Sequence, residues 1–137
     1  MAELTVQFVR PDRLIYEGPA ASVILATPRG ELGIWPGRRP SICALGDGVV
    51  RLNRREEDGG GIARVIVSGG YAEVDNDTVI VLADHARRTD DIDIAQTEQL
   101  LEDAKTTLAG LAEDDNRQAY WKHKVKWFSM LLKYADR

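Results

Sequence analysis

The most informative stretch of the sequence runs Gly30-Glu31-Leu32-Gly33-Ile34-Trp35-Pro36-Gly37-Arg38-Arg39-Pro40. Glycine allows backbone conformations that other residues avoid, and proline fixes φ and lacks an N–H donor. Glycines and prolines at this density predict a shaped loop rather than a strand or a helix. The apolar residues of the loop are Leu32, Ile34 and Trp35, and they either fill the core or are presented to a partner.

On both sides of this loop, residues 1–88 carry the pattern of short β-strands. Leu4, Val6 and Phe8 alternate with polar residues, which is the period of a half-buried strand. Further strands are expected at 14–16, 23–26, 49–52, 64–68, 71–74 and 78–83. Asp75-Asn76-Asp77 predicts a tight hairpin turn, and Glu56-Glu57-Asp58-Gly59-Gly60-Gly61 predicts a polar hairpin tip. Short strands at this spacing predict a β-sandwich.

From Asp91 onward the apolar period becomes that of amphipathic helices. One stripe is formed by Ile94, Thr97, Leu100, Leu101, Ala104, Leu108 and Leu111, with Asp90 or Asp91 as the expected N-cap. A second helix is expected from Arg117 to about Ala135, and its aromatic arc contains Lys124. The fold predicted is all-β plus α: an N-terminal β-sandwich at 1–88 followed by a C-terminal antiparallel two-helix hairpin at 89–137.

The charge changes sharply along the chain. The 137 residues carry a net charge of −4, but residues 91–115 hold one Lys against eight acidic residues. Residues 116–137 hold six basic residues against Asp136 alone, and three of their lysines lie opposite the aromatic arc: Lys122, Lys126 and Lys133. The arc is wider than one partner helix covers. Its surplus either packs on the sandwich or meets a second partner, for which a protein with an acidic patch is favoured over a membrane or nucleic acid.

Several classes of protein are excluded or disfavoured. No apolar run reaches the roughly 18 residues of a membrane span, and no signal peptide is visible at the N-terminus. The single cysteine, Cys43, excludes an internal disulfide. His85 and His123 lie outside any cluster with metal-ligand spacing, so we expect no catalytic residues, no metal and no cofactor.

Four motifs in order resemble the epsilon subunit of F-type ATP synthases, the equivalent of mitochondrial delta. They are Leu4-Thr5-Val6 with Pro11-Asp12 and Tyr16-Glu17-Gly18, the stretch Gly30–Pro40, Val67–Val74, and Leu82-Ala83-Asp84 through Asp93. The family usually has His-Ala where this chain has Arg38-Arg39. The resemblance covers the β part throughout and the helical part in layout.

The resemblance implies a non-catalytic rotor subunit that couples ion-driven rotation of the c-ring to ATP synthesis and inhibits ATP hydrolysis through its helices. It implies contact with the c-ring through Glu31, Leu32, Ile34, Trp35, Arg38 and Arg39, and contact with γ through Ser68, Gly69, Gly70 and Tyr71. Lys122, Lys126 and Lys133 are implied contacts of the catalytic β subunits. The expected location is peripheral, on the cytoplasmic face of a bacterial inner membrane, or on the thylakoid for a plastid-encoded chain.

Some members of this family bind ATP through an Ile/Leu-Asp-x-x-Arg-Ala motif. Here Asp93 is retained, but Gln96 replaces the arginine, and Arg87 stands where an acidic residue is often used. A neutral amide does not supply guanidinium charge to a triphosphate. The sequence therefore predicts weak or no ATP binding.

Two other interpretations remain open from the sequence. One is a free-standing β-sandwich binding module with a helical dimerisation tail, which would purify alone rather than with a large complex. The other is a small enzyme whose site forms only on folding, which a deep pocket with converging polar groups would support.

Overall fold

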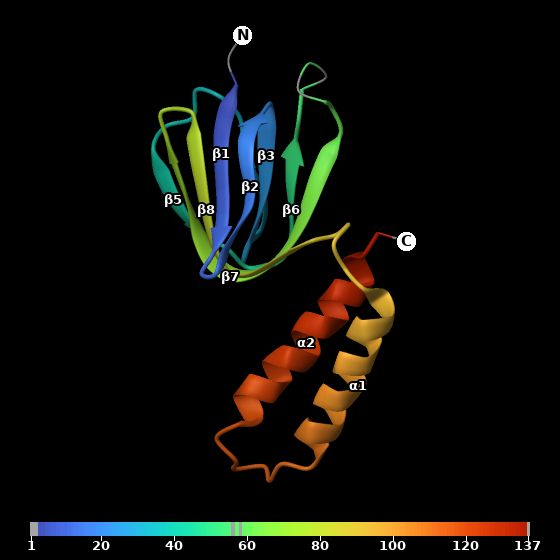
Figure 1. The fold of residues 1–137 in the computed structure, drawn as a ribbon. Coiled ribbons are helices and arrows are strands. Elements are labelled where there is room, and N and C mark those ends of the chain that lie inside the picture. The colour runs from blue at the N-terminus through green and yellow to red at the C-terminus, as the bar shows by residue number, and fades with distance from the viewer. Residues whose placement is uncertain (1–2, 56, 58, 137) are drawn as a thin grey trace. The chain divides into compact units, whose positions relative to one another are not determined.

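The computed structural model describes residues 3–55, 57 and 59–136, which form two compact units, Met1–Arg88 and Thr89–Arg137. The strands are β1 (Leu4–Arg10), β2 (Arg13–Ala20), β3 (Ser22–Thr27), β4 (Gly30–Ile34), β5 (Ser41–Ala44), β6 (Asp47–Asn53), β7 (Ile62–Asp75) and β8 (Thr78–Arg88), and the helices are α1 (Ile94–Ala109) and α2 (Gln118–Tyr134) (Figure 1). No helix in the described ranges is both long and apolar enough to cross a membrane.

The strands pair in the order β2-β1-β8-β7-β6-β3-β4, and β5 joins through β7. The pairing of β1 with β8 is parallel, whereas the other pairs are antiparallel. The long strand β7 pairs with β6 up to Ser68 and with β5 from Tyr71 onward. Because one strand serves both layers, the sheet folds over itself and encloses a core.

Two glycines lie where β7 changes its partner. Gly69 and Gly70 have φ values of +74° and +111°, which strain any other residue. A Cβ placed on Gly70 would lie 2.1 Å from the backbone oxygen of Leu82 on the neighbouring strand. The close approach of β7 and β8 at this bend therefore requires glycine.

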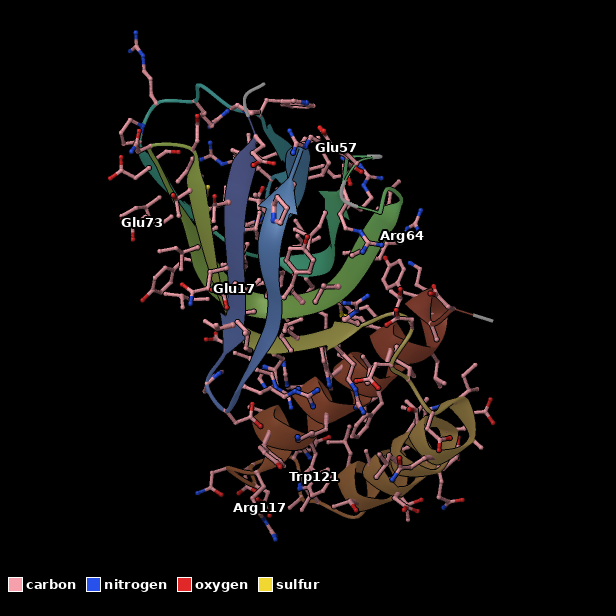
Figure 2. All side chains as sticks on the ribbon, turned by 45° about the horizontal axis from the view of Figure 1, so that its top comes forward. Glu17, Glu57, Arg64, Glu73, Arg117 and Trp121 are labelled. Atoms are coloured by element: carbon pink, nitrogen blue, oxygen red, sulfur yellow. The ribbon has the colours of Figure 1, made fainter. Side chains whose placement is uncertain are left out.

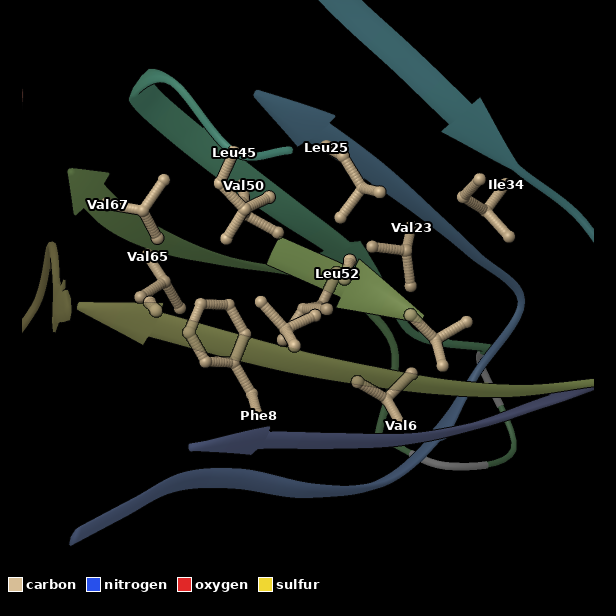
Figure 3. Close-up of a cluster of buried hydrophobic side chains, with 14 of the residues drawn as sticks. Val6, Phe8, Val23, Leu25, Ile34, Leu45, Val50, Leu52, Val65 and Val67 are labelled. Atoms are coloured by element: carbon tan, nitrogen blue, oxygen red, sulfur yellow. The ribbon is translucent and has the colours of Figure 1, made fainter. Parts of the chain in front are cut away.

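The sandwich core is built from the alternating apolar residues that the sequence indicated. Leu4, Val6 and Phe8 of β1 are fully buried, together with residues of β3, β6, β7 and β8. Figure 3 shows Val6 and Phe8 within this core. Truncating a buried aromatic such as Phe8 to alanine costs about 3–5 kcal/mol in proteins generally. The predicted β-sandwich is confirmed, and so is the tight turn after Asp75: Asn76 and Asp77 have φ values of +51° and +60°, as a two-residue type I′ hairpin requires.

The structure corrects the prediction at several strands. The first half of the stretch 30–40 is not a loop, because Gly30–Ile34 forms β4 and pairs antiparallel with β3. The prediction missed β5, and the strands expected at 64–68 and 71–74 are one continuous strand. Within the expected polar tip between β6 and β7, Glu56 and Asp58 lie outside the described residues.

In the helical unit, α1 and α2 pack against each other as a hairpin. Thr97 and Ala104 are the buried residues of α1, and α2 buries Trp127 and Leu131. The two ends of the unit are joined by a 2.9 Å hydrogen bond from the backbone N–H of Asp136 to the backbone oxygen of Thr89.

Two details of the first helix differ from the prediction. The N-cap is Asp93 rather than Asp90 or Asp91, since its Oδ1 accepts the backbone N–H of Gln96 at 3.0 Å. Leu100 is 41% exposed and so lies outside the buried stripe in which it was expected.

Candidate functional site

The loop at residues 35–40 connects β4 to β5 and is tied to a distant turn. The backbone N–H of Gly37 donates a 2.7 Å hydrogen bond to Oδ1 of Asp77, between β7 and β8. Gly37 has a φ of +89°, and prolines at 36 and 40 restrict the backbone on either side. These constraints hold the loop in one shape at the end of the sandwich.

Three large side chains of this loop face solvent. Trp35 lies back over Gly33, where an added Cβ would come within 2.2 Å of Cζ3 of the indole, yet it stays 58% exposed. Arg38 and Arg39 are also exposed, and no described residue forms an ion pair or hydrogen bond with their guanidinium groups. The loop thus presents an aromatic ring and two unpaired cations.

The other residues expected at the c-ring lie along β4. Glu31 is exposed and pairs with Nη2 of Arg51 at 3.0 Å. Leu32 is half-buried against the core, and Ile34 is fully buried within it. The side chain of Ile34 therefore supports the strand from inside and is left out of the candidate surface. The three apolar residues of the stretch divide between the core and the surface, so neither of the two alternatives holds for all of them.

The residues expected to contact γ lie at the bend of β7. Ser68 is buried, and its Oγ donates a 2.7 Å hydrogen bond to Oδ1 of Asp47. Gly69 and Gly70 shape the backbone there. Tyr71 is 54% exposed and is the one large side chain of this group that faces outward.

Tyr71 belongs to a larger apolar row that sequence reasoning missed. The strand registers place five residues side by side across β5, β7, β8, β1 and β2: Ala44, Tyr71, Leu82, Val9 and Leu14. Ala44, Tyr71, Leu82 and Leu14 are exposed, and Val9 is half-buried. Finding this row from the sequence would require the register of all five strands. We call it the apolar row.

The next outward-facing row is more polar. It consists of Ile42, Glu73, Ile80, Gln7 and Glu17, and Figure 2 shows Glu73 projecting away from the sandwich. The bordering row is thus mixed: Gln7, Glu17 and Glu73 are polar, whereas Ile80 is half-buried and Ile42 is 74% exposed. An exposed apolar strip with a partly polar border is typical of a protein–protein interface.

A groove of about 330 Å³ is lined in part by three residues of the apolar row. Its walls are Val9, Arg10, Pro11, Tyr71, Leu82, Ala83 and Asp84. Arg10 is fixed at its edge by Oδ1 of Asp12 at 2.6 Å and by the oxygen of Ala86 at 3.0 Å. The hydrogen bond from Arg10 holds the pKa of the Asp12 carboxyl below its usual range.

The basic helix α2 presents the predicted lysines to solvent. Lys122, Lys126 and Lys133 are all exposed. Lys124, which the sequence placed inside the aromatic arc, has its Nζ 5.3 Å from the ring centre of Tyr120 and 6.0 Å from that of Phe128. Cation–π attraction thus accounts for a lysine at this position. Tyr120 itself is 56% exposed and meets Trp121 edge-to-face.

Asp93, the retained residue of the incomplete ATP motif, has a structural role. The carboxylate of Asp93 caps α1, and the backbone oxygen of Asp93 accepts a 2.7 Å hydrogen bond from the Oγ1 hydroxyl of Thr97. Gln96 follows in the first turn of the helix, and Arg87 lies in β8. Among the described residues, no group of three or more His, Cys, Asp or Glu side chains could hold a metal ion.

The family model for the ATP synthase delta/epsilon chain β-sandwich domain matches residues 3–89, which is more than half of the chain. The chain belongs to the ATP synthase delta/epsilon family. The ATP synthase epsilon chain of Synechococcus elongatus is 41% identical over 129 residues, covering 90% of this chain and 91% of that relative. The epsilon chain of Moorella thermoacetica is 41% identical over 108 residues, covering 79% of this chain and 78% of that relative. The expected family is confirmed.

Solved structures share the fold of this family member. A chain in the Euglena gracilis mitochondrial ATP synthase, OSCP/F1/c-ring, matches with a TM-score of 0.73 and 22% identity, covering 96% of this chain and 80% of that one. A chain in the Tetrahymena thermophila mitochondrial ATP synthase central stalk/c-ring matches with a TM-score of 0.53 and 15% identity, covering 96% and 97%. Likeness at these identities concerns the fold alone.

Proposed function

We propose that this chain is the epsilon-type rotor subunit in the central stalk of an F-type ATP synthase. In this role it couples ion-driven rotation of the c-ring to ATP synthesis, without carrying out catalysis itself. The observation that carries the proposal is the family match over residues 3–89, together with 41% identity to epsilon chains along most of the sequence. The subunit would be peripheral to the membrane, held there by the complex on its cytoplasmic face.

The apolar row is the proposed γ-binding surface. Tyr71 and Leu82 lie at its centre, opposite each other on β7 and β8. Both are exposed in a sheet face that would otherwise be expected to carry polar residues. The groove that they help to line gives a partner side chain room to enter. This surface extends the contact expected at Ser68–Tyr71 across the neighbouring strands.

The proposed c-ring surface combines β4 with the loop that follows it. Glu31 and Leu32 contribute from the strand, and Trp35, Arg38 and Arg39 from the loop. The hydrogen bond between Gly37 and Asp77 supports this assignment, because a fixed loop loses little conformational entropy on binding.

The proposed contact with the catalytic β subunits lies on α2. Lys122, Lys126 and Lys133 offer a basic face to an acidic segment, and this contact would restrain ATP hydrolysis. The start of α1, where the incomplete ATP motif lies, is not proposed to bind ATP. Gln96 supplies no charge to phosphates, and the Asp93 carboxylate is engaged as a helix cap.

The proposal is tested by affinity capture of the tagged full-length chain, co-expressed with the γ subunit and c-ring of its own organism. We expect both partners to be retained. The double variant Tyr71→Ser/Leu82→Ser should bind γ with an affinity about tenfold lower or worse. The reason is that truncating a central anchor residue of an interface costs over about 1 kcal/mol of binding free energy.

The matched control is Ile62→Ser, which removes an apolar side chain that is 44% exposed and lies outside the apolar row. This variant should bind γ like the wild type. Purification of the chain as a homodimer without γ or c-ring would contradict the rotor assignment and favour the free-standing module. An equal loss of γ binding in the control would contradict the assignment of the apolar row as the γ-binding surface, but not the rotor assignment.

A further inference from the structure

The loop at residues 35–40 presents two guanidinium groups beside an exposed indole. Arg38 and Arg39 are exposed neighbours at its tip, without an ion-pair or hydrogen-bond partner among the described residues. Two neighbouring carboxylates have other partners: Asp77 accepts the N–H of Gly37, and Glu31 pairs with Arg51. Asp75, in the turn that Gly37 contacts through Asp77, is exposed but forms no ion pair with either arginine. The two guanidinium groups are therefore available to an external anion.

We propose that Trp35, Arg38 and Arg39 bind the phosphate headgroups of an anionic phospholipid surface. Guanidinium groups match phosphate oxygens through paired N–H donors. The indole of Trp35 is amphipathic and more than half exposed, as suits the headgroup level of a bilayer. The loop thus combines the two elements of a membrane-surface contact.

A lipid surface fits this loop better than a soluble phosphate does. The arginines stand on a protruding loop, and a Cβ added at Gly37 meets no atom within 4 Å, so no cradle surrounds an anion there. A single phosphate on such a tip would be held weakly in water. A bilayer instead offers many headgroups at high density, together with an interfacial layer for the indole.

The loop's fixed shape supports the same occupant. Trp35 is positioned over Gly33, and Gly37 is hydrogen-bonded to Asp77, so the ring and the arginines keep their spacing. The inference adds to the proposed c-ring contact, since a loop at the ring also lies at the membrane surface. It is tested on the chain without the ring, so that the two proposals can fail separately.

The test measures co-sedimentation of the full-length chain with phosphatidylcholine vesicles, with and without phosphatidylglycerol, at low ionic strength. We expect binding only when phosphatidylglycerol is present. The variant Arg38→Ala/Arg39→Ala should reduce the partition coefficient by roughly fivefold for each charge removed. Adding Trp35→Ser to this variant should lower the partition coefficient further. Concentrated salt should abolish vesicle binding because it screens the headgroup charges.

The matched control is Arg29→Ala/Arg64→Ala, which removes the same charge from the β3–β4 turn and from β7, where Figure 2 shows Arg64 projecting outward. This control should bind like the wild type. Absence of wild-type binding, equal loss in the control, or unchanged binding by the loop variant would each overturn the proposal.

Two additional measurements distinguish lipid headgroups from soluble phosphate and from the c-ring as the ligand of the arginines. Inorganic phosphate at the same phosphate concentration should not displace the chain from vesicles, and full displacement would overturn the lipid assignment. Capture of the detergent-solubilised c-ring is measured in parallel. Loss of ring capture with unchanged vesicle binding in the loop variant would assign the arginines to the ring instead.

Discussion

Gly37 and Asp77 are 40 residues apart, yet the backbone N–H of one donates a 2.7 Å hydrogen bond to Oδ1 of the other. This bond links the loop after β4 to the type I′ turn between β7 and β8. Asp77 has a φ of +60°, so its backbone conformation is itself one that glycine adopts readily. A single substitution can therefore remove the carboxylate without disturbing the turn.

We expect Asp77→Gly to loosen the loop while leaving the sandwich folded. The turn geometry is kept, but the N–H of Gly37 loses its acceptor. The amide of Gly37 should then exchange with solvent faster, by roughly tenfold for about 1.4 kcal/mol of lost protection. Hydrogen exchange followed by NMR measures this. Asp77→Asn keeps an acceptor oxygen and should stay close to wild type, so equal loss in both variants would argue against the bond.

Gly70→Ala should destabilise the sandwich far more than Gly30→Ala. The two glycines have similar φ values, +111° and +116°, so an alanine is strained at either position. A Cβ at Gly70 would lie 2.1 Å from the oxygen of Leu82, whereas one at Gly30 meets nothing within 4 Å. We expect about 1–3 kcal/mol for Gly30→Ala from strain and a clearly larger loss for Gly70→Ala.

Urea unfolding of both glycine variants decides the point. A greater loss of free energy of unfolding at Gly70 than at Gly30 reports the steric contact between β7 and β8, because both positions carry the strain of a positive φ. Equal losses of unfolding free energy would mean that β7 and β8 move apart at the bend and so accommodate the methyl group.

The start of α2 should respond to acid through one ion pair. Nη2 of Arg117 lies 2.8 Å from Oδ2 of Asp115, and the hydrogen bonds from Arg117 lower the pKa of Asp115 to about 2. Because the folded-state pKa lies below the unfolded one, the contribution to stability is present above about pH 4 and is lost as the pH falls toward 2. NMR titration of the Asp115 carboxyl measures this, and Arg117→Gln should move its midpoint up toward the ordinary value.

Much of the fold follows from local patterns in the sequence. The alternation of Leu4, Val6 and Phe8 predicted a half-buried strand, and Asn76-Asp77 predicted the hairpin turn, because both signals are confined to neighbouring residues. The change to helical periodicity near residue 90 likewise predicted the two-helix hairpin. In each case the determining interactions lie within a few residues of one another.

The errors arise where distant pairing overrides local preference. Gly30 and Gly33 indicated a loop, but β4 is an edge strand that bonds to β3 on one side only, where glycine is tolerated. Gly69-Gly70 suggested an interruption, whereas pairing with β8 on both sides of the bend keeps β7 continuous. The apolar row depends on the register of five strands, which no local pattern encodes.

The basic face of α2 should be required for the proposed inhibition of ATP hydrolysis. Changing Lys122, Lys126 and Lys133 to Glu should relieve inhibition and raise ATP hydrolysis by the assembled enzyme, because the proposed acidic partner segment would then be repelled. All three side chains are exposed, so the helical hairpin should remain folded. The matched control is Lys105→Glu, which alters an exposed lysine of α1 and should leave hydrolysis unchanged. Unchanged inhibition in the triple variant, with γ still bound, would reject the contact with the β subunits while leaving the rotor assignment intact.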